Sequence, residues 1–244
     1  MLNAAKRGGT FPKEGVKKGV KKGAASVVGA VRERLSASFG AEKLRAMLRV
    51  ASHPIDGFYE IRYRGKGSVP LAAVMAALFS ACYTGNRIFA SFVVNDVDPR
   101  SIDGLMEMSA IFVLLALFAA GNWSVTCLLD GEGRFRDIVT ATGYALLPMI
   151  VTTVLAALVS QFIASGEEVF YTLIIALGVA WTAMLLLTGV MTVHNYTLLK
   201  TLATLILTVL AMFALVFFAL LLADMIRQVY VFFYSVYVEL AFRA

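Results

Sequence analysis

The sequence has 244 residues, of which 59% are hydrophobic and 16% are charged, and its mean hydropathy is +0.78. Soluble proteins average about 45–50% apolar residues, so this chain carries too few charges to cover a soluble monomer, and we predict a membrane protein. Its net charge of +6 is uneven, because residues 1–66 hold 15 of the 22 basic residues but 5 of the 16 acidic ones. A basic head therefore precedes a hydrophobic body.

The sequence lacks the signals that are typical of several other protein classes. Cys82 and Cys127 both lie in apolar stretches and give neither a disulfide framework nor the spacing of zinc ligands. No apolar stretch follows the basic residues 1–23 directly, so no secretory signal peptide is predicted. The head has no nucleic-acid motif, so we expect it to contact anionic lipid or a partner protein and no nucleic acid.

The basic head divides into two parts. Residues 1–23 are rich in glycine and lysine, and glycine disfavours a helix by about 1 kcal/mol relative to alanine, so we predict a flexible arm that lies near anionic headgroups or is simply solvated. In residues 24–68, apolar residues at helical spacing over 24–50 predict a basic amphipathic helix or a pair of helices. The polar segment 51–68 predicts a loop with an aromatic edge, typical of a membrane interface.

The hydrophobic body contains stretches long enough to cross a bilayer. About 20 helical residues span the roughly 30 Å of hydrocarbon. The predicted spans are five: 69–94, 105–129, 138–164, 168–193 and 200–223. They form a membrane domain over 69–228. The aromatic segment 229–244 is short for a crossing, so we predict a short interfacial helix there, with a sixth span as the alternative.

The connections between the spans predict the orientation. The connection 130–136 carries Arg134 and Arg136, and the connection near 194–200 carries a lysine, whereas 95–104 and 165–168 are acidic. Basic connections stay in the cytoplasm. We therefore predict an all-α polytopic protein of the cell membrane, with five transmembrane helices, a cytoplasmic N terminus and the C terminus outside.

Three strings in the body resemble a known family. They are HPIDGFYEIRYRGKGS (53–68), NWSVTCLLDGEGRFRDIVTATGYALLP (122–148) and VHNYTLLKTLATLILT (193–208). Together, over about 51–243, they resemble the bacterial branch of the Yip domain family, the Ypt-interacting-protein-like five-span membrane proteins. The family has a cytoplasmic N terminus and its C terminus across the membrane, which agrees with the charge pattern.

The resemblance implies a scaffold more than an activity. Eukaryotic relatives are thought to bind small GTPases and to shape or sort vesicles, whereas some bacterial relatives are encoded beside sugar-uptake ABC transporters. It therefore implies an accessory subunit whose partners are integral membrane proteins, plausibly the permease subunits of a carbohydrate importer. This inference rests on the habits of the family and not on a site.

Catalysis is not expected. The adjacent Glu167 and Glu168 suggest an intramembrane protease of the prenyl-protein-processing type, but that site requires an arginine where the chain has Thr172. It also requires histidines on other spans, and the chain has only His53 in the head and His194 at a span end. We predict no catalytic residue, no metal ligand and no cofactor, and we assign the glutamates to a solvated turn and helix start.

The connection 130–136 could bind phosphate, because glycine amides and arginines attract anions. Asp130, Glu132 and Asp137 repel the same anion, and the spacing of a P-loop is absent. We therefore favour a tight turn in which Arg134 and Arg136 fix the topology. The alternative is a docking surface for a partner.

Polar residues within the spans are the remaining candidates, since their burial in lipid is costly. Arg87 lies near the outer end of the first span, where we favour snorkelling to the headgroups over an ion pair with Glu107. A glycine permits close helix approach, and a proline can kink a span. The candidate structural or partner-binding residues are Asn86, Arg87, Glu107, Asn122, Trp123, Gly131, Gly133, Arg134, Arg136, Gly143, Tyr144 and Pro148.

We thus predict a non-catalytic membrane scaffold or accessory subunit that associates with another membrane complex through helix packing. The alternative function is a small transporter or channel that acts on its own. A transport pathway would leave paired discontinuous helices or several intramembrane ionisable groups, and we find no convincing internal repeat.

Overall fold

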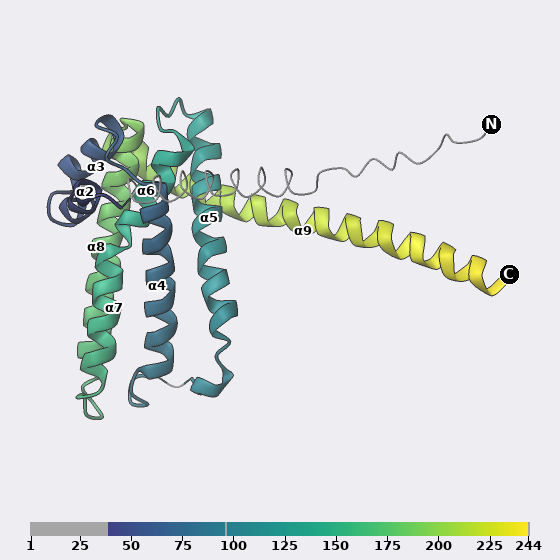
Figure 1. Ribbon diagram of the computed structural model, residues 1–244, viewed down its shortest axis with the longest axis horizontal. Helices are drawn as coiled ribbons and strands as arrows, with labels where there is room; N and C mark the ends of the chain where they lie inside the picture. Colours follow the sequence, from purple (N-terminus) through teal and green to yellow (C-terminus); the bar gives the residue numbers. More distant parts are fainter. Residues whose placement is uncertain (1–38, 96, 244) are drawn as a thin grey trace, which may run out of the picture. The chain divides into compact units, whose positions relative to one another are not determined.

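The computed structural model describes residues 39–95 and 97–243, and the regular elements of these ranges are all helical (Figure 1). Five of its helical stretches are long and apolar enough to cross a membrane, so the prediction of an all-α polytopic fold with five spans is confirmed. The predicted arm 1–23 and residues 24–38 of the amphipathic segment lie outside the described residues.

Four of the five stretches begin and end close to the predicted limits, whereas the fifth begins close to its predicted start and ends well beyond its predicted end. The five stretches are α4 (Val69–Phe89), α5 (Gly104–Leu128), α6 with α7 (Phe135–Ala145 and Leu147–Ser160), α8 (Glu168–His194) and α9 (Leu198–Arg243). Asp103 caps α5, because its carboxylate accepts hydrogen bonds from the backbone N–H groups of Leu105 and Met106, each at 3.1 Å. A short 3₁₀ helix, η1 (Pro99–Ser101), precedes it.

Two short helices precede the spans. α2 (Ala41–Ser52) confirms the end of the predicted amphipathic segment, with Ala46, Met47 and Val50 buried. The prediction of a loop over 51–68 is wrong in its centre, where α3 (Pro54–Tyr63) forms with a proline in its first turn. A Cβ at Gly57 would lie 2.7 Å from the Cα of Val50. Gly57 is therefore the contact that brings α3 against α2, and not a break in the chain.

The third span is divided within the described structure. α6 ends at Ala145 and α7 begins at Leu147, with Pro148 in its first turn. A proline has no N–H to continue the hydrogen-bond ladder of the preceding helix. The helix is therefore interrupted directly before Pro148, and the side chain of Thr152 donates a hydrogen bond to the Pro148 carbonyl at 3.0 Å.

The last helix differs from the prediction. α9 is a single helix of 46 residues, so residues 229–243 continue the fifth span and do not form a separate short helix. Asp224 and Arg227 do not end it, because their side chains pair with each other one turn apart at 2.7 Å. At 1.5 Å per residue its length is about 70 Å, more than twice the hydrocarbon thickness.

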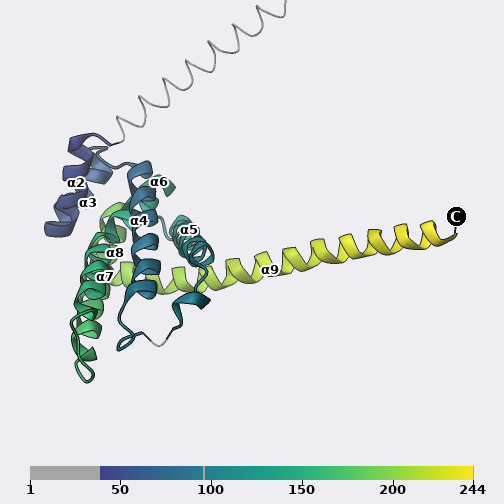
Figure 2. The same ribbon diagram turned by 60° about the horizontal axis from the view of Figure 1, so that its bottom comes forward.

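The core lies where α2, α3, α4, α6, α7 and α8 pack together. α4, α7 and α8 run side by side and α5 flanks α4 (Figures 1 and 2). Phe58 of α3, Tyr144 of α6 and Leu185 of α8 are fully buried there. α9 contacts α5 through its first part, where Thr208 and Met212 lie against Gly121. Most other side chains of α5 and α9 are exposed and apolar, which suits a lipid environment.

A glycine contact sets the distance between α4 and α6. A Cβ at Gly143 would lie 2.8 Å from the Cα of Ala72, whereas a Cβ at Gly85, also within a helix, would meet nothing. We expect Gly143→Ala to lower the melting temperature of the purified protein, because overpacking costs about 1–3 kcal/mol and each kcal/mol is worth about 2–4 °C. Gly85→Ala is the matched control and should leave the melting temperature unchanged or slightly higher. Equal behaviour of the two variants would contradict the tight crossing.

Candidate functional site

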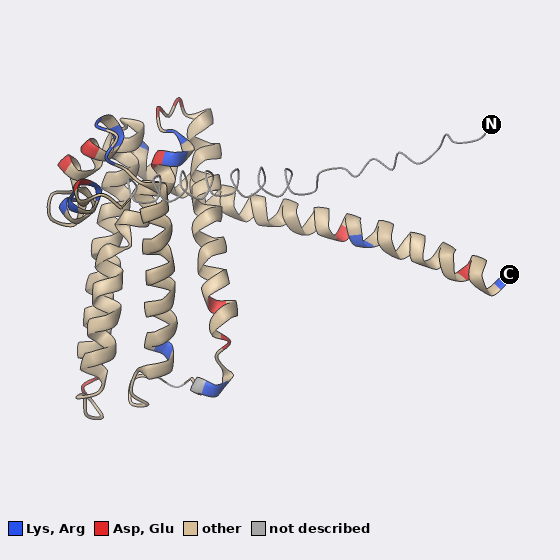
Figure 3. Ribbon diagram, in the orientation of Figure 1, with Lys and Arg blue, Asp and Glu red and all other residues tan. Residues whose placement is uncertain are grey.

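Charged side chains gather at the two ends of the bundle formed by α4, α5, α7 and α8, and the middles of these helices are free of them (Figure 3). We define the basic end by α2, α3, the connection 129–134 and the connection 195–197. The opposite end holds the connections 90–103 and 161–167. Because the sequence predictions concentrate on the connection after α5, the basic end is the candidate site.

A buried histidine holds the connection 129–134 at the basic end. The backbone N–H of Gly133 donates a hydrogen bond to Nδ1 of His194 at 3.2 Å. His194 is 1% exposed, and the ring of Tyr196 stacks on it with ring centres 5.4 Å apart. The Tyr196 hydroxyl donates to the Leu129 carbonyl at 2.9 Å. The C-terminal end of α8 and the residues after it therefore fix both ends of this connection.

Two positions of this connection have no room for a side chain larger than that of glycine. A Cβ at Gly133 would lie 2.5 Å from Cε1 of His194, and a Cβ at Gly131 would lie 2.6 Å from its Nδ1. Burial raises the pKa of Tyr196, and Asp130 adds to the rise, so the phenol remains a hydrogen-bond donor at neutral pH. The predicted tight turn at 130–136 is thus present, and its geometry is set by long-range packing.

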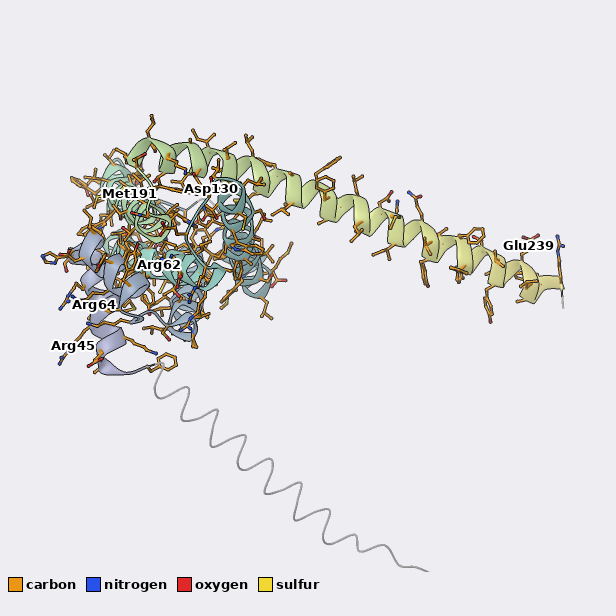
Figure 4. All side chains as sticks on the ribbon, turned by 90° about the horizontal axis from the view of Figure 1, so that it is seen from above. Arg45, Arg62, Arg64, Asp130, Met191 and Glu239 are labelled. Atoms are coloured by element: carbon orange, nitrogen blue, oxygen red, sulfur yellow. The ribbon has the colours of Figure 1, made fainter. Side chains whose placement is uncertain are left out.

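Arg62 connects α3 to the same region. Its Nη1 donates to the carboxylate of Asp137 at 2.8 Å, and its Nη2 donates to the carbonyl of Glu132. The side chains of Arg62 and Asp137 are only 12% and 17% exposed. Figure 4, which views the molecule from above, shows Arg62 in the middle of this end, with Arg45 and Arg64 at its edge. This buried, hydrogen-bonded pair orients α3 on the start of α6.

A second ion cluster holds α2 on α3. The carboxylate of Glu60, whose side chain is 8% exposed, pairs with Arg49 at 2.6 Å, Lys66 at 3.0 Å and Arg64 at 3.2 Å. The hydrogen bond from Lys66 holds the pKa of Glu60 below its ordinary value against the opposing effect of burial, and the charges of Arg49 and Arg64 lower it further. Glu60 therefore stays ionised at neutral pH and collects three of the cations of the head.

Arg87 and Glu107 form an ion pair between α4 and α5 near the opposite end. The favoured interpretation, in which Arg87 snorkels alone, is therefore wrong, and the alternative pairing is present. The side chain of Arg87 is 35% exposed and that of Glu107 is 19% exposed, so the pair is partly shielded from solvent. The position of Arg87 along its own helix could not decide between the two interpretations, because its partner belongs to the neighbouring helix.

Two asparagines bond across helices. Asn86 donates to the hydroxyl of Tyr171 at 2.8 Å and links α4 to α8. Asn122, fully buried, donates to the hydroxyl of Thr208 at 3.1 Å and links α5 to α9. Trp123, 46% exposed, packs edge-on against Phe135 with ring centres 5.9 Å apart. The two asparagines are thus held through their amide N–H groups, while their side-chain oxygens have no hydrogen-bond partner among the described residues.

The remaining candidates lie along α6 and α7 or at their ends. The hydroxyl of buried Tyr144 accepts a hydrogen bond from the backbone N–H of Ser68 at 3.2 Å, directly before α4. The exposed side chains of Arg134 and Arg136 make no ion pair and no hydrogen bond with the residues that the structure describes. The glutamates at 167 and 168 form an exposed turn at the start of α8, as predicted, and bond the backbone N–H groups of Ala164 and Gly166.

The predicted residues thus fall into separate places. The basic end brings together Gly131, Gly133, Arg134 and Arg136, whereas Asn86, Arg87 and Glu107 lie near the opposite end. Within residues 39–95 and 97–243, no three histidine, cysteine or acidic side chains come close enough to hold a metal ion. His194, Tyr196 and Arg62 were not predicted as site residues. The only signal for His194 was a polar residue at a span end followed by Asn-Tyr-Thr.

The Yip1 domain family matches residues 48–221, which is most of the sequence. The chain belongs to the Yip1 domain family. This is a family of multi-span membrane proteins, and with five helices able to cross a membrane the chain is a multi-pass membrane protein. The matched range begins in α2 and ends within α9. Comparison with curated proteins and with solved structures gave no match.

The ion pair between α4 and α5 gives a prediction. Arg87→Gln and Glu107→Gln should each destabilise the purified protein by about 1–3 kcal/mol, because each leaves a partly buried charge without its partner. The double exchange Arg87→Glu with Glu107→Arg should recover much of this loss in a melting experiment. Arg100→Gln removes an exposed arginine from the same end and is the control. An exchange no more stable than the single variants would argue against the pair.

The histidine that holds the connection 129–134 gives another prediction. His194→Phe keeps a ring but removes the acceptor for the Gly133 N–H, which should cost about 1–3 kcal/mol. The loosened connection should also be cut faster by trypsin after Arg134 or Arg136, a local effect that mass spectrometry of the fragments detects. His53→Phe alters the exposed histidine and should change neither property. Unchanged cleavage in His194→Phe would contradict the role of the histidine.

Proposed function

We propose that this Yip1-family protein is a non-catalytic scaffold or accessory subunit that binds other integral membrane proteins within the bilayer. The observation that carries the proposal is an apolar groove of about 260 Å³ along the faces of α4, α5 and α6. We call it the alanine groove. Its lining is almost entirely apolar, and the residues are Ala72, Ala73, Ala76, Phe112, Leu115, Ala116, Ala119, Phe135, Val139, Thr142 and Gly143.

The alanine groove suits a helix as its occupant. Helices in lipid associate by close packing, since lipid gives no hydrophobic force between them, and small side chains let the backbones approach. Ala73 and Ala116 are exposed on opposite walls of the groove, on α4 and α5. A partner helix laid between them would contact alanines instead of bulky leucines, which favours protein over disordered acyl chains.

The polar side chains of the spans support the scaffold more than a transporter. Asn86 pairs with Tyr171, Asn122 with Thr208 and Arg87 with Glu107, and each pair joins two neighbouring helices. Transport pathways place ionisable groups around a shared cavity near the middle of the bilayer. The pairs here lie on different helix contacts, so their geometry supports a structural role.

The proposed setting is the cell membrane with the basic end in the cytoplasm, supported by the excess of lysine and arginine in residues 1–66. The head would then contact anionic lipid or the cytoplasmic face of the partner. The partner that we propose is a permease subunit of a carbohydrate-importing ABC transporter. The only support for this partner is that some bacterial relatives are encoded beside such transporters.

The proposal is tested by purification in mild detergent. We expect the full-length protein to bring down partner membrane proteins in a fixed ratio, and we expect Ala116→Phe, which fills the alanine groove, to reduce that recovery at least about fivefold, an effect of about 1 kcal/mol. Ala180→Phe adds the same bulk to an exposed position of α8 outside the groove and should retain the partners.

Two results would overturn the proposal. One is a solitary, homogeneous protein that moves a solute in liposomes, which would support the transporter alternative. The other is equal partner recovery with both phenylalanine variants, which would remove the groove as the contact. Deletion of residues 1–50 should weaken the association while the five spans remain inserted.

A further inference from the structure

The basic end contains a second cavity, polar and larger than the alanine groove, with a volume of about 390 Å³. We call it the arginine cavity. It is formed by the end of α3, the connection 65–67 and the first turns of α6. Three of its lining residues are cations and one is an anion: Arg62, Arg134, Arg136 and Asp137.

We propose that the arginine cavity binds a phosphate-bearing anion, with the headgroup of an acidic phospholipid as its source. The cavity carries two net positive charges, because Asp137 neutralises one of the three arginines. That one is Arg62, which already holds the carboxylate at 2.8 Å. Arg134 and Arg136 make no ion pair or hydrogen bond with the described residues, so two guanidinium groups remain available to a ligand.

The start of α6 adds backbone donors next to two of these arginines. Arg134 is the N-cap residue directly before α6, and the first N–H groups of a helix, here those of Phe135 and Arg136, have no carbonyl within the helix to bond. The positive end of the helix dipole therefore meets the guanidinium groups, an arrangement that favours phosphate. Because an arginine presents several N–H donors in one plane, it can hold two phosphate oxygens at once.

Three nearby carboxylates were expected from the sequence to repel a phosphate, and the structure does not support that expectation. Asp130 and Glu132 do not line the arginine cavity. Asp130 lies close enough to Tyr196 to raise its pKa, and Glu132 supplies only its backbone carbonyl, to Arg62. Asp137 does line the cavity, but its carboxylate is already paired with Arg62. The repulsion inferred from the sequence is therefore largely removed by the fold.

The position of the arginine cavity selects a lipid over a soluble ligand. Gly67 lies two residues before α4 begins, and Arg136 is the second residue of the third span, so the cavity lies where two spans meet the headgroup layer. Tyr63 lines it and is 50% exposed, with its ring centre 4.7 Å from that of Tyr59. Tyrosines of this kind are typical of membrane interfaces.

The inference does not depend on the scaffold role, because binding is measured on the purified full-length protein alone. Native mass spectrometry from detergent would follow retention of phosphatidylglycerol, with phosphatidylcholine as the neutral comparison. We expect one phosphatidylglycerol to be retained preferentially, and Arg134→Gln with Arg136→Gln to weaken it about tenfold or more, since each basic residue near an anionic lipid is worth roughly fivefold in affinity.

Matched variants distinguish binding at the arginine cavity from a general effect of positive charge. Arg45→Gln with Arg100→Gln also removes two exposed arginines, neither of which lines the arginine cavity, and should leave the affinity within about twofold of the original. Arg134→Lys with Arg136→Lys keeps both charges but loses the paired donors, so it should bind more weakly than the original and more tightly than the glutamine double variant. An equal loss in the two glutamine double variants would overturn the site.

Inorganic phosphate and glycerol 3-phosphate distinguish the sources of the anion. Binding of phosphatidylglycerol without measurable binding of either soluble anion supports the lipid headgroup. Equal binding of inorganic phosphate, lost in the Arg134 and Arg136 glutamine variant, supports the anion site but assigns it to a soluble ligand and overturns the lipid source. Equal retention of phosphatidylglycerol and phosphatidylcholine would overturn the proposal as a whole.

Discussion

A single requirement organises this protein: the backbone polar groups that enter the hydrocarbon must find partners within the chain, and an unpaired polar side chain there is costly. The long helices meet it for the backbone, and threonines meet it for side chains by bonding a carbonyl four residues back in the same helix, as Thr153 and Thr208 do. Groups that cannot bond within their own helix bond the next one, as Asn122 bonds Thr208. Helix contacts without such a bond, as between α4 and α6, are set by close packing at a glycine.

The same requirement explains the contrast between the two sides of the bundle. Around α6 the turn at 129–134 would leave backbone groups unpaired, and it is enclosed by side chains that bond it: His194 accepts from the N–H of Gly133, and Arg62 donates to the carbonyl of Glu132. α5 and α9 have continuous ladders and need no such enclosure, so most of their surface is left to lipid or to a partner. Burial is thus concentrated where the backbone is irregular.

The sequence predicts the spans well because their signal, about 20 apolar residues, is local and strong. It fails where the deciding contact is distant. Arg87 was expected to snorkel because it lies near the outer end of its span, yet it forms the alternative pair with Glu107 of α5. The segment 51–68 was predicted to be a loop, whereas Gly57 within it packs a helix against Val50. His194 was missed for the same reason, since its bond to Gly133 joins residues 61 positions apart.

The orientation of α6 links the two surfaces to which we assign binding. At about 100° per residue, Phe135, Val139 and Gly143 fall on one face, which lines the alanine groove. The residues that line the arginine cavity, Arg136 and Thr140 among them, fall on the neighbouring face. The close contact between Gly143 and α4 fixes the rotation of α6, so it sets both faces at once. A lipid or a partner that displaced α6 at one face would therefore also displace the lining of the other.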